Sequence, residues 1–143
     1  LTAYQIEPQR LELELTESAI TDNSELCEHL LGDLAEKGIV LALDDFGTGY
    51  SSLLQLQKHP FSVLKIDRSF IQSICENKND LQLLKAISAF AKTLGMLVVA
   101  EGVETEEQKN WCQELEFDRI QGYYFARPMA AEDFEKNFLH ELL

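Results

Sequence analysis

Five short segments with strand character recur along this sequence, and a segment with helical periodicity follows each of them. The predicted strands cover residues 11–15, 39–43, 63–67, 96–100 and 118–122. The segment 39–43 is apolar throughout instead of alternating, which is typical of a parallel strand covered on both faces. Repeated alternation of strand and helix predicts an α/β fold with a parallel sheet and right-handed crossovers. Two architectures fit this pattern, an open doubly wound sheet and a piece of a barrel.

The helices are predicted from apolar stripes and from the residues that end them. The longest stripe covers residues 83–94 and ends at Gly95. Thr105, followed three residues later by Gln108, predicts a capped start for the next helix. The polar segment 77–80 is predicted to be a loop.

The charge balance argues against one class of partner. The chain carries 12 basic and 25 acidic residues, which gives a net charge of −13. Such a surface repels the phosphate backbone of a nucleic acid, so no nucleic acid polymer is expected as a partner. A small phosphorylated substrate could still bind through metal ions.

Length predicts the number of domains, and cysteine content predicts the cellular compartment. Its 143 residues suffice for one ordinary domain. The three cysteines are odd in number and widely spaced, which is typical of reduced thiols in a reducing compartment and predicts a cytoplasmic location. No segment approaches the roughly 18 apolar residues that cross a bilayer, although an upstream segment of a longer protein could supply a membrane anchor.

The end of the second predicted strand carries two adjacent acids. Asp44 and Asp45 follow residues 39–43 directly, and a turn built around Gly47 and Gly49 follows the acids. Two neighbouring carboxylates that are enclosed by protein need an opposite charge, and a divalent cation is the simplest candidate. The alternative is a pair of solvated loop acids in which Asp45 caps the next helix.

Unusual polar residues also follow the other predicted strands. Parallel topology brings the carboxyl ends of the strands to one rim, where α/β proteins bind their ligands. Acids from several strands at one rim favour a metal site over separate solvated acids. Nearby glycines are expected to let a ligand approach the backbone. The residues expected at the rim are Glu14, Asp44, Asp45, Lys65, Glu101, Glu104 and Gln121, and the glycines are Gly47, Gly102 and Gly122.

The residue types of this rim predict the metal and the chemistry. Oxygen ligands without histidine or cysteine indicate a hard cation, Mg²⁺ or Mn²⁺. A pair of such ions can polarise a phosphorus centre, activate a bridging water and stabilise the entering and leaving oxygens. Asp44 and Asp45 are adjacent, so one of them could bridge the two ions. Lys65 would orient the water or neutralise charge that builds on the phosphate.

Five motifs in one order resemble a known family across nearly the whole chain. The motifs are ELTES at 14–18, DDFGTGYSSL at 44–53, LKIDRSFI at 64–71, VVAEGVET at 98–105 and QGYYFARPM at 121–129. Together they are similar to the EAL family of bacterial cyclic di-GMP phosphodiesterases. The resemblance implies a TIM-type (β/α)8 barrel that uses Mg²⁺ or Mn²⁺ to hydrolyse cyclic di-GMP to linear pGpG.

The resemblance also implies a metal-binding and catalytic set. Glu14 resembles the family's metal-binding glutamate, and the pair Asp44 and Asp45 resembles its metal-binding aspartates. Lys65 resembles the active-site lysine. Glu101 resembles the acid that serves the second metal or its water and that acts as a general base.

Three further positions resemble supporting residues of the family. Glu17 is similar to the glutamate that holds the glycine-rich loop after Asp45. Glu104 and Gln121 resemble residues that contact substrate and water.

The resemblance covers part of a domain. The Glu-Ala-Leu segment with its metal-binding glutamate, and a later metal-binding asparagine, are not found in this sequence. A complete barrel needs about 250 residues, so residues 1–143 are expected to be the C-terminal part of a single EAL-type barrel domain. The 143-residue chain alone is expected to be inactive or to self-associate, while the parent protein is an active enzyme.

The resemblance implies partners and leaves alternatives open. The expected partners are cyclic di-GMP and sensor or GGDEF-type domains elsewhere in the parent chain, with a homodimer as a possible assembly. One alternative is a catalytically inactive EAL-type domain that binds cyclic di-GMP as a receptor or scaffold. Another is an unrelated barrel enzyme acting on a small phosphorylated metabolite. A barrel whose acids are purely structural is the third.

Overall fold

The chain folds around a curved sheet of parallel strands. A computed structural model describes residues 1–21, 24–47 and 53–139. Each strand pairs in parallel with the next strand along the chain, so the order in the sheet is the order in the sequence. A doubly wound sheet would reverse this order at a switch point, so the structure selects the barrel alternative. The strands are β1 (Glu12–Thr16), β2 (Val40–Phe46), β3 (Val63–Ile66), β4 (Leu97–Ala100) and β5 (Arg119–Ile120).

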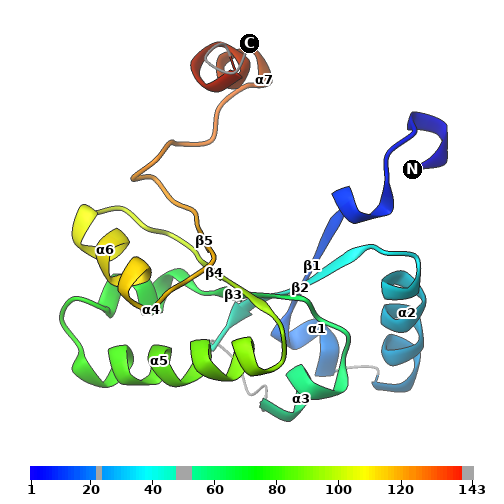
Figure 1. Ribbon diagram of the computed structural model, residues 1–143, viewed down its shortest axis with the longest axis horizontal. Helices are drawn as coiled ribbons and strands as arrows, with labels where there is room; N and C mark the ends of the chain where they lie inside the picture. The colour runs from blue at the N-terminus through cyan, green and yellow to red at the C-terminus, as the bar shows by residue number, and fades with distance from the viewer. Residues whose placement is uncertain (22–23, 48–52, 140–143) are drawn as a thin grey trace.

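The helices that connect the strands lie along one side of the sheet (Figure 1). They are α1 (Glu17–Thr21), α2 (Ser24–Glu36), α3 (Leu53–Lys58), α4 (Arg68–Ser73), α5 (Lys78–Thr93) and α6 (Glu106–Glu114). Short 3-10 turns η1 (Thr2–Tyr4) and η2 (Pro8–Arg10) precede β1. At the C-terminal end, α7 (Ala131–Phe134) continues into the π-helical turn η3 (Glu135–Leu139) and stands apart from the other helices. None of the described helices is long and apolar enough to cross a membrane.

The two faces of the sheet bury different residues. Successive side chains of a strand point to opposite faces. On the face toward the helices, Leu41, Leu43 and Leu64 belong to the main hydrophobic core. On the other face, Ala42 and Val63 form a smaller buried cluster with Val99. The strands therefore carry side chains inward as well as outward, as barrel strands do.

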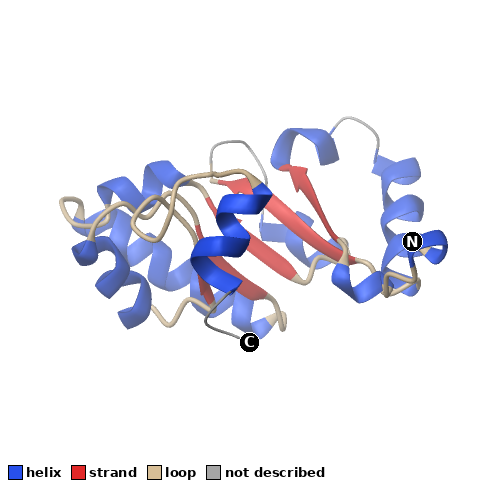
Figure 2. Cartoon of the chain, turned by 90° about the horizontal axis from the view of Figure 1, so that it is seen from above, coloured by secondary structure: helices blue, strands red, loops and turns tan. Residues whose placement is uncertain are grey.

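An ion pair between the first and last strands shows that the sheet is strongly curved. Arg119 Nη1 on β5 lies 3.3 Å from Glu12 Oε2 on β1. In a flat sheet, four strand spacings of about 4.8 Å would separate these strands by about 19 Å. The sheet is therefore concave on its inner face, and Figure 2 shows neighbouring strands turned relative to one another. The structure has the form of an arc of a barrel wall.

One sequence prediction of a loop is wrong. Residues 77–80 are not a loop, because α5 begins at Lys78. The side chain of Asn77 accepts a hydrogen bond from the backbone N–H of Asn79, at 3.0 Å. Asparagine in this position satisfies a helix N–H that has no partner within the helix. The polar residues that suggested a loop thus form the capped start of a helix.

The predicted capping pair of α6 is confirmed. The backbone N–H of Gln108 donates to the hydroxyl of Thr105 at 3.2 Å, and Gln108 Oε1 accepts from the Thr105 backbone N–H at 3.1 Å. The same oxygen accepts from the Glu104 backbone N–H at 2.8 Å. The cap therefore fixes both the start of α6 and the backbone of a predicted site residue.

Replacement of Thr105 by alanine should lower the free energy of unfolding by about 1 kcal/mol, the usual effect of losing a threonine cap. Urea-induced unfolding of the complete domain measures this change. Thr93→Ala is the matched control, because the Thr93 hydroxyl donates to Ala89 O inside α5 and caps nothing. Equal losses in the two variants would contradict the capping role.

Candidate active site

A bulge at the end of β2 brings its two acids to one place. The sequence predicted that the strand stops at residue 43, but β2 continues through Asp44 and Asp45 to Phe46. Leu43 pairs with Leu64 and Phe46 with Ile66, so β2 holds one more residue than β3 over this stretch. Adjacent side chains of a regular strand point to opposite faces, whereas a bulge changes their direction.

The backbone at Asp45 accounts for this bulge. Asp45 has a φ of 55°, in the left-handed region that few residues other than glycine adopt. Carboxylate oxygens of Asp44, Asp45 and Glu101 all lie within 4.8 Å of one another. Strained backbone of this kind is found where a functional side chain needs an unusual direction. Gly49, the second glycine predicted for the turn after Asp45, lies outside the described residues.

Lys65 lies among three acids, and each acid comes from a different segment of the chain. Its side chain, only 6% exposed, points to the inner face of β3. Lys65 Nζ is 2.7 Å from Glu14 Oε1, 2.8 Å from Glu101 Oε1 and 3.1 Å from Asp44 Oδ1. The structure therefore brings Glu14, Asp44, Lys65 and Glu101 together at one rim, as the topology predicted.

The enclosed charges change the protonation equilibria of this cluster. Burial alone would lower the pKa of Lys65, but its contacts with Glu101, Glu14 and Asp44 outweigh burial and raise that pKa above its ordinary value. Burial raises the pKa of Glu101 even though Lys65 acts against this shift. Burial, followed by the charge of Asp44, raises the pKa of Asp45. The carboxylates of Glu101 and Asp45 therefore still lack enough positive charge around them.

These residues fit a divalent cation. Asp44 Oδ1 is buried and accepts no well-aligned hydrogen bond from the described residues, although Lys65 Nζ is close by. Lys65 supplies one positive charge to three carboxylates, so the cluster keeps negative charge that a second cation would offset. The grouped ligand atoms are all carboxylate oxygens, the donor set that Mg²⁺ and Mn²⁺ prefer.

Glu17 contacts the turn that follows the two aspartates. Its side chain on α1 is buried, with 4% of the residue exposed. Glu17 Oε2 accepts a hydrogen bond from the backbone N–H of Gly47 at 3.3 Å. The start of the loop after Asp45 is thus tied to the helix that follows β1.

Gln121 and Glu104 lie at the rim but take different partners. Gln121 Nε2 donates to Glu101 Oε1 at 3.1 Å, which joins it to the acid cluster. Glu104 Oε1 lies 2.8 Å from Arg68 Nη2 and is not one of the carboxylates around Lys65. Gln121 therefore belongs to the acid cluster, whereas Glu104 pairs with Arg68 outside it.

A side chain at any of the three predicted glycines would meet other parts of the chain. Gly47, Gly102 and Gly122 were expected to let a ligand approach the backbone, and Gly102 and Gly122 do line a pocket. On the side where a Cβ would stand, the chain's own atoms fill the space. A Cβ at Gly47 would overlap the ring of Phe70, and one at Gly102 would overlap the side chain of Arg68. A Cβ at Gly122 would overlap backbone atoms of the segment after β4. These glycines permit close packing of the loops that carry the acids.

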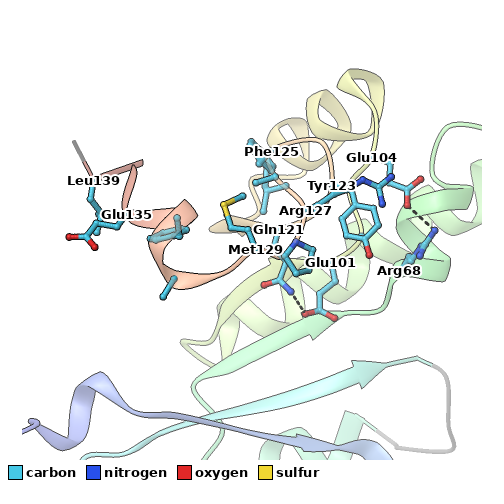
Figure 3. Close-up of a pocket in the computed structure, with 17 residues that line it drawn as sticks. Arg68, Glu101, Glu104, Gln121, Tyr123, Phe125, Arg127, Met129, Glu135 and Leu139 are labelled. Carbon is cyan, nitrogen blue, oxygen red and sulfur yellow. Dashed lines mark hydrogen bonds and ion pairs between the residues drawn. The ribbon is translucent and has the colours of Figure 1, made fainter. Parts of the chain in front are cut away.

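A pocket of about 1040 Å³ opens beside the acid cluster (Figure 3). Glu101, Glu104 and Gln121 line one part of it. The segment after β5 supplies Tyr123, Phe125, Arg127 and Met129, and α7 and η3 supply Phe134 and Leu139. The acids thus border a cavity that is large enough for a ligand of nucleotide size.

Sequence reasoning overlooked Arg68, which also lines the pocket. An arginine at the first position of a helix resembles an ordinary solvated residue. Its location directly after the third predicted strand, beyond Lys65, was the available signal. The segment 123–129 belongs to the motif QGYYFARPM. Its aromatic residues were the signal that it lines a cavity.

Comparison with known proteins places these features in a family. The family model of the EAL domain matches residues 1–128. The signaling protein YkoW of Bacillus subtilis is 43% identical over 141 residues, which cover 99% of this chain and 18% of YkoW. The bifunctional diguanylate cyclase/cyclic di-GMP phosphodiesterase MucR of Pseudomonas aeruginosa is 42% identical over 132 residues, which cover 92% of this chain and 19% of MucR. The chain thus spans less than a fifth of the length of these relatives.

Solved structures show the same fold. The phosphodiesterase PaMucR in complex with c-di-GMP superimposes with a TM-score of 0.87 at 42% identity, covering 94% of this chain and 54% of that one. BlrP1 of Klebsiella pneumoniae, in a complex with manganese and cyclic di-GMP, gives a TM-score of 0.85 at 32% identity over 90% of this chain and 33% of BlrP1. EAL domains are TIM-type (β/α)8 barrels, and the five parallel strands are part of such a barrel. The chain belongs to the EAL domain family.

Proposed function

We propose that this chain is the C-terminal part of a metal-dependent phosphodiesterase that hydrolyses cyclic di-GMP to linear pGpG. The observation that carries the proposal is the convergence of Glu14, Asp44 and Glu101 on Lys65, with Asp45 alongside, at the rim of a large pocket. A relative named as a cyclic di-GMP phosphodiesterase and a related structure in complex with c-di-GMP support this substrate.

In this proposal Glu14, Asp44 and Asp45 hold two Mg²⁺ or Mn²⁺ ions. The grouping of oxygens from Asp44 and Asp45 with one from Glu101, and the raised pKa of Asp45, caused first by burial, support that role. Glu14 lies outside that group, and its support is its contact with Lys65 beside the aspartates. Manganese in the related BlrP1 complex agrees with it. The ions would polarise the phosphate and activate water, the usual contribution of metals to phosphate ester hydrolysis.

Lys65 and Glu101 are the proposed catalytic residues. Glu101 accepts a proton from the water whose oxygen attacks phosphorus, and its pKa, raised by burial, suits a general base. The bond from phosphorus to a ribose 3′ oxygen breaks, and that oxygen takes a proton from a solvent water. Lys65 remains charged and neutralises the negative charge that builds on the phosphate oxygens.

The supporting residues have separate proposed roles. Glu17 holds the loop after Asp45 through the Gly47 N–H. Gln121 fixes the side chain of Glu101 and contacts water or substrate. Glu104, at the same pocket, contacts substrate.

The rest of the parent protein, its location and its assembly are part of the same proposal. Residues 1–143 form part of one barrel domain, whose remaining segments complete the metal site, so the chain alone is expected to be inactive. The free thiols of Cys27, Cys75 and Cys112 support a cytoplasmic location. Sensor or GGDEF-type domains in the parent chain and assembly as a homodimer complete the proposed setting.

The test is a product assay with the complete parent protein. Cyclic di-GMP is incubated with the protein and Mg²⁺ or Mn²⁺, with and without EDTA, and nucleotides are separated by chromatography. We expect pGpG to form only while free metal is present. Tight binding without turnover would instead favour the receptor alternative. Turnover of another phosphorylated metabolite without binding of cyclic di-GMP would favour an unrelated enzyme.

A further inference from the structure

The proposed general base lies on the short connection between β4 and α6. Glu101 follows β4 directly, and Gly102 comes next with a φ of 70°, a backbone conformation that glycine adopts readily. Three backbone N–H groups of this connection donate hydrogen bonds to other segments: Glu101 to Ile66 O at 3.2 Å, Val103 to Gln121 O at 3.1 Å and Glu104 to Gln108 Oε1 at 2.8 Å. Within the described part of the chain, Gly102 makes no hydrogen bond with another backbone group. Its contact is instead with a side chain from another segment.

Arg68 supplies that side chain. It is the first residue of α4 and follows Lys65 by three positions. A Cβ on Gly102 would overlap the Cβ, Cγ and Cδ atoms of Arg68, so the aliphatic stem of the arginine lies directly against the glycine backbone. The stem of an arginine can pack in this way while its charged head makes polar contacts. Arg68 thus limits movement of the connection on the side that faces α4.

The guanidinium of Arg68 is held between two elements. Its Nη2 lies 2.8 Å from Glu104 Oε1, at the far end of the same connection (Figure 3). On its own helix, the side-chain oxygen of Gln72 accepts from Arg68 Nε at 2.6 Å and from Nη2 at 2.8 Å, in the amide orientation that satisfies both groups of Gln72. Arg68 therefore contacts the connection at Gly102 and at Glu104 and is itself fixed by α4.

The start of α4 is fixed relative to Lys65. Asp67 caps this helix, since its Oδ1 accepts from the Ser69 backbone N–H at 2.9 Å. Lys65 lies two residues before the cap, on β3. Arg68 thereby joins the segment that carries Lys65 to the segment that carries Glu101. The side chains of Lys65 and Glu101 meet at 2.8 Å between Nζ and Oε1.

Resting on the proposed function, in which Glu101 is the general base, we propose that Arg68 is a positioning residue that holds Glu101 against Lys65. The side chains of Arg68 and Glu104 are 53% and 37% exposed, and ion pairs of that kind contribute about 0–1 kcal/mol. The effect of Arg68 is therefore mainly on position and only slightly on stability. A general base must lie within hydrogen-bond reach of its proton, and a displacement of about 1 Å can lower a rate about 10²-fold. The stem on Gly102 and the pair with Glu104 together prevent such a displacement.

The test compares three substitutions at Arg68 in the complete parent protein. Arg68→Ala removes both contacts and should lower the kcat for cyclic di-GMP by about 10- to 100-fold. The KM should change by less than about threefold, because the substitution displaces a reacting group and removes no proposed substrate contact. Arg68→Met keeps most of the stem over Gly102 and should lose less activity than Arg68→Ala. Arg68→Lys also keeps a charge for Glu104 and should recover most of the kcat.

Amide hydrogen exchange of the same proteins tests the contacts of Arg68 without substrate. Exchange reports local opening of the backbone. The amides of residues 101–104 should therefore exchange faster in Arg68→Ala than in the unmodified protein, with Arg68→Met between the two. The amides of α2, which Arg68 does not approach, should exchange at unchanged rates.

Lys58→Ala is the matched control. Lys58 Nζ lies 2.9 Å from Glu28 Oε2, and both side chains are half-exposed. Lys58 ends α3 shortly before β3 begins, so it lies at the end of the strands away from the rim. Its substitution should change neither the kcat nor the exchange of residues 101–104. An equal fall of kcat in Lys58→Ala would show that the loss of any surface ion pair has this effect, which would overturn the inference.

Three further outcomes overturn the inference and leave the proposed function intact. An unchanged kcat in Arg68→Ala would exclude a positioning role. A raised KM with a retained kcat would make Arg68 a substrate contact instead. Unchanged exchange of residues 101–104 would show that Arg68 does not hold the connection. If the unmodified parent protein forms no pGpG, the proposed function is rejected, whereas faster exchange in Arg68→Ala would still show that Arg68 fixes the segment carrying Glu101.

Discussion

Replacing Lys65 by methionine in the complete domain should lower the kcat for cyclic di-GMP by about 10²- to 10³-fold, the usual effect of removing one electrostatic contact to a developing charge. The substitution keeps most of the length of the side chain and removes its charge. Lys65 Nζ contacts Glu14, Asp44 and Glu101 in the structure, so no other described cation replaces it within this cluster.

The same substitution should distinguish the role of Lys65 from the role of the metal ligands, because the two differ in how stability responds to metal. Without metal, the carboxylates lose their buried counterion, and the free energy of unfolding should fall by up to about 3–5 kcal/mol. Added Mn²⁺ supplies positive charge to the same oxygens, so it should raise the Tm of Lys65→Met more than the Tm of the unmodified domain. Asp44→Asn removes a proposed ligand instead and should lose this response to Mn²⁺.

Lys92→Met is the matched control for Lys65→Met. Lys92 Nζ lies 2.9 Å from Glu116 Oε2, but these side chains are 36% and 82% exposed. An ion pair of that kind contributes about 0–1 kcal/mol. Calorimetric titration with Mn²⁺ and thermal melts measure all three variants. Retained turnover in Lys65→Met, or loss of its response to Mn²⁺, would contradict the role proposed for Lys65.

Local sequence predicted the strands because their burial is encoded locally. The apolar segment 39–43 and the segment 96–100 become parts of β2 and β4, which carry buried side chains on both faces, although Leu97 at the start of β4 is exposed. The order of the strands could not be predicted, since a doubly wound sheet and a barrel have the same alternation. Contacts distant in sequence, such as that of Arg119 with Glu12, accompany the curvature of the barrel.

The candidate site was predictable in position and not in detail. Parallel strands end at one rim, so the meeting of Glu14, Asp44 and Glu101 follows from topology alone. The bulge at Asp45 depends on the pairing of β2 with β3, which no local pattern contains. The chemical roles of these residues remain predictions.

The close packing at the glycines could not be predicted for a similar reason. Their neighbours come from other segments, such as Phe70 against Gly47 and Arg68 against Gly102. A glycine in a sequence shows that space is needed, but it does not show what fills the space. Here, packed loops fill it and hold the acids in place.

Among these glycines, Gly122 is the position where an added side chain should destabilise the domain most. A Cβ there would overlap the backbone N and O of Val103. Those atoms are fixed, since the Val103 N–H donates to Gln121 O at 3.1 Å and Val103 O accepts from the Tyr124 N–H at 2.9 Å. The backbone cannot move aside without breaking both hydrogen bonds between the segment after β4 and the segment after β5.

Gly122→Ala should therefore destabilise the complete domain by several kcal/mol. Overpacking costs about 1–3 kcal/mol, and each lost hydrogen bond adds about 0.5–1.5 kcal/mol. Glu101 and Gln121 belong to the two separated segments, so turnover should also fall even where the domain stays folded.

Gly32→Ala is the matched control, because Gly32 lies in helix α2 and a Cβ there meets no atom within 4 Å. That control should gain up to about 1 kcal/mol, since alanine is the better helix former. Urea unfolding and the pGpG assay compare the two variants. If Gly122→Ala were as stable and as active as Gly32→Ala, contact between these loops would not hold the site together.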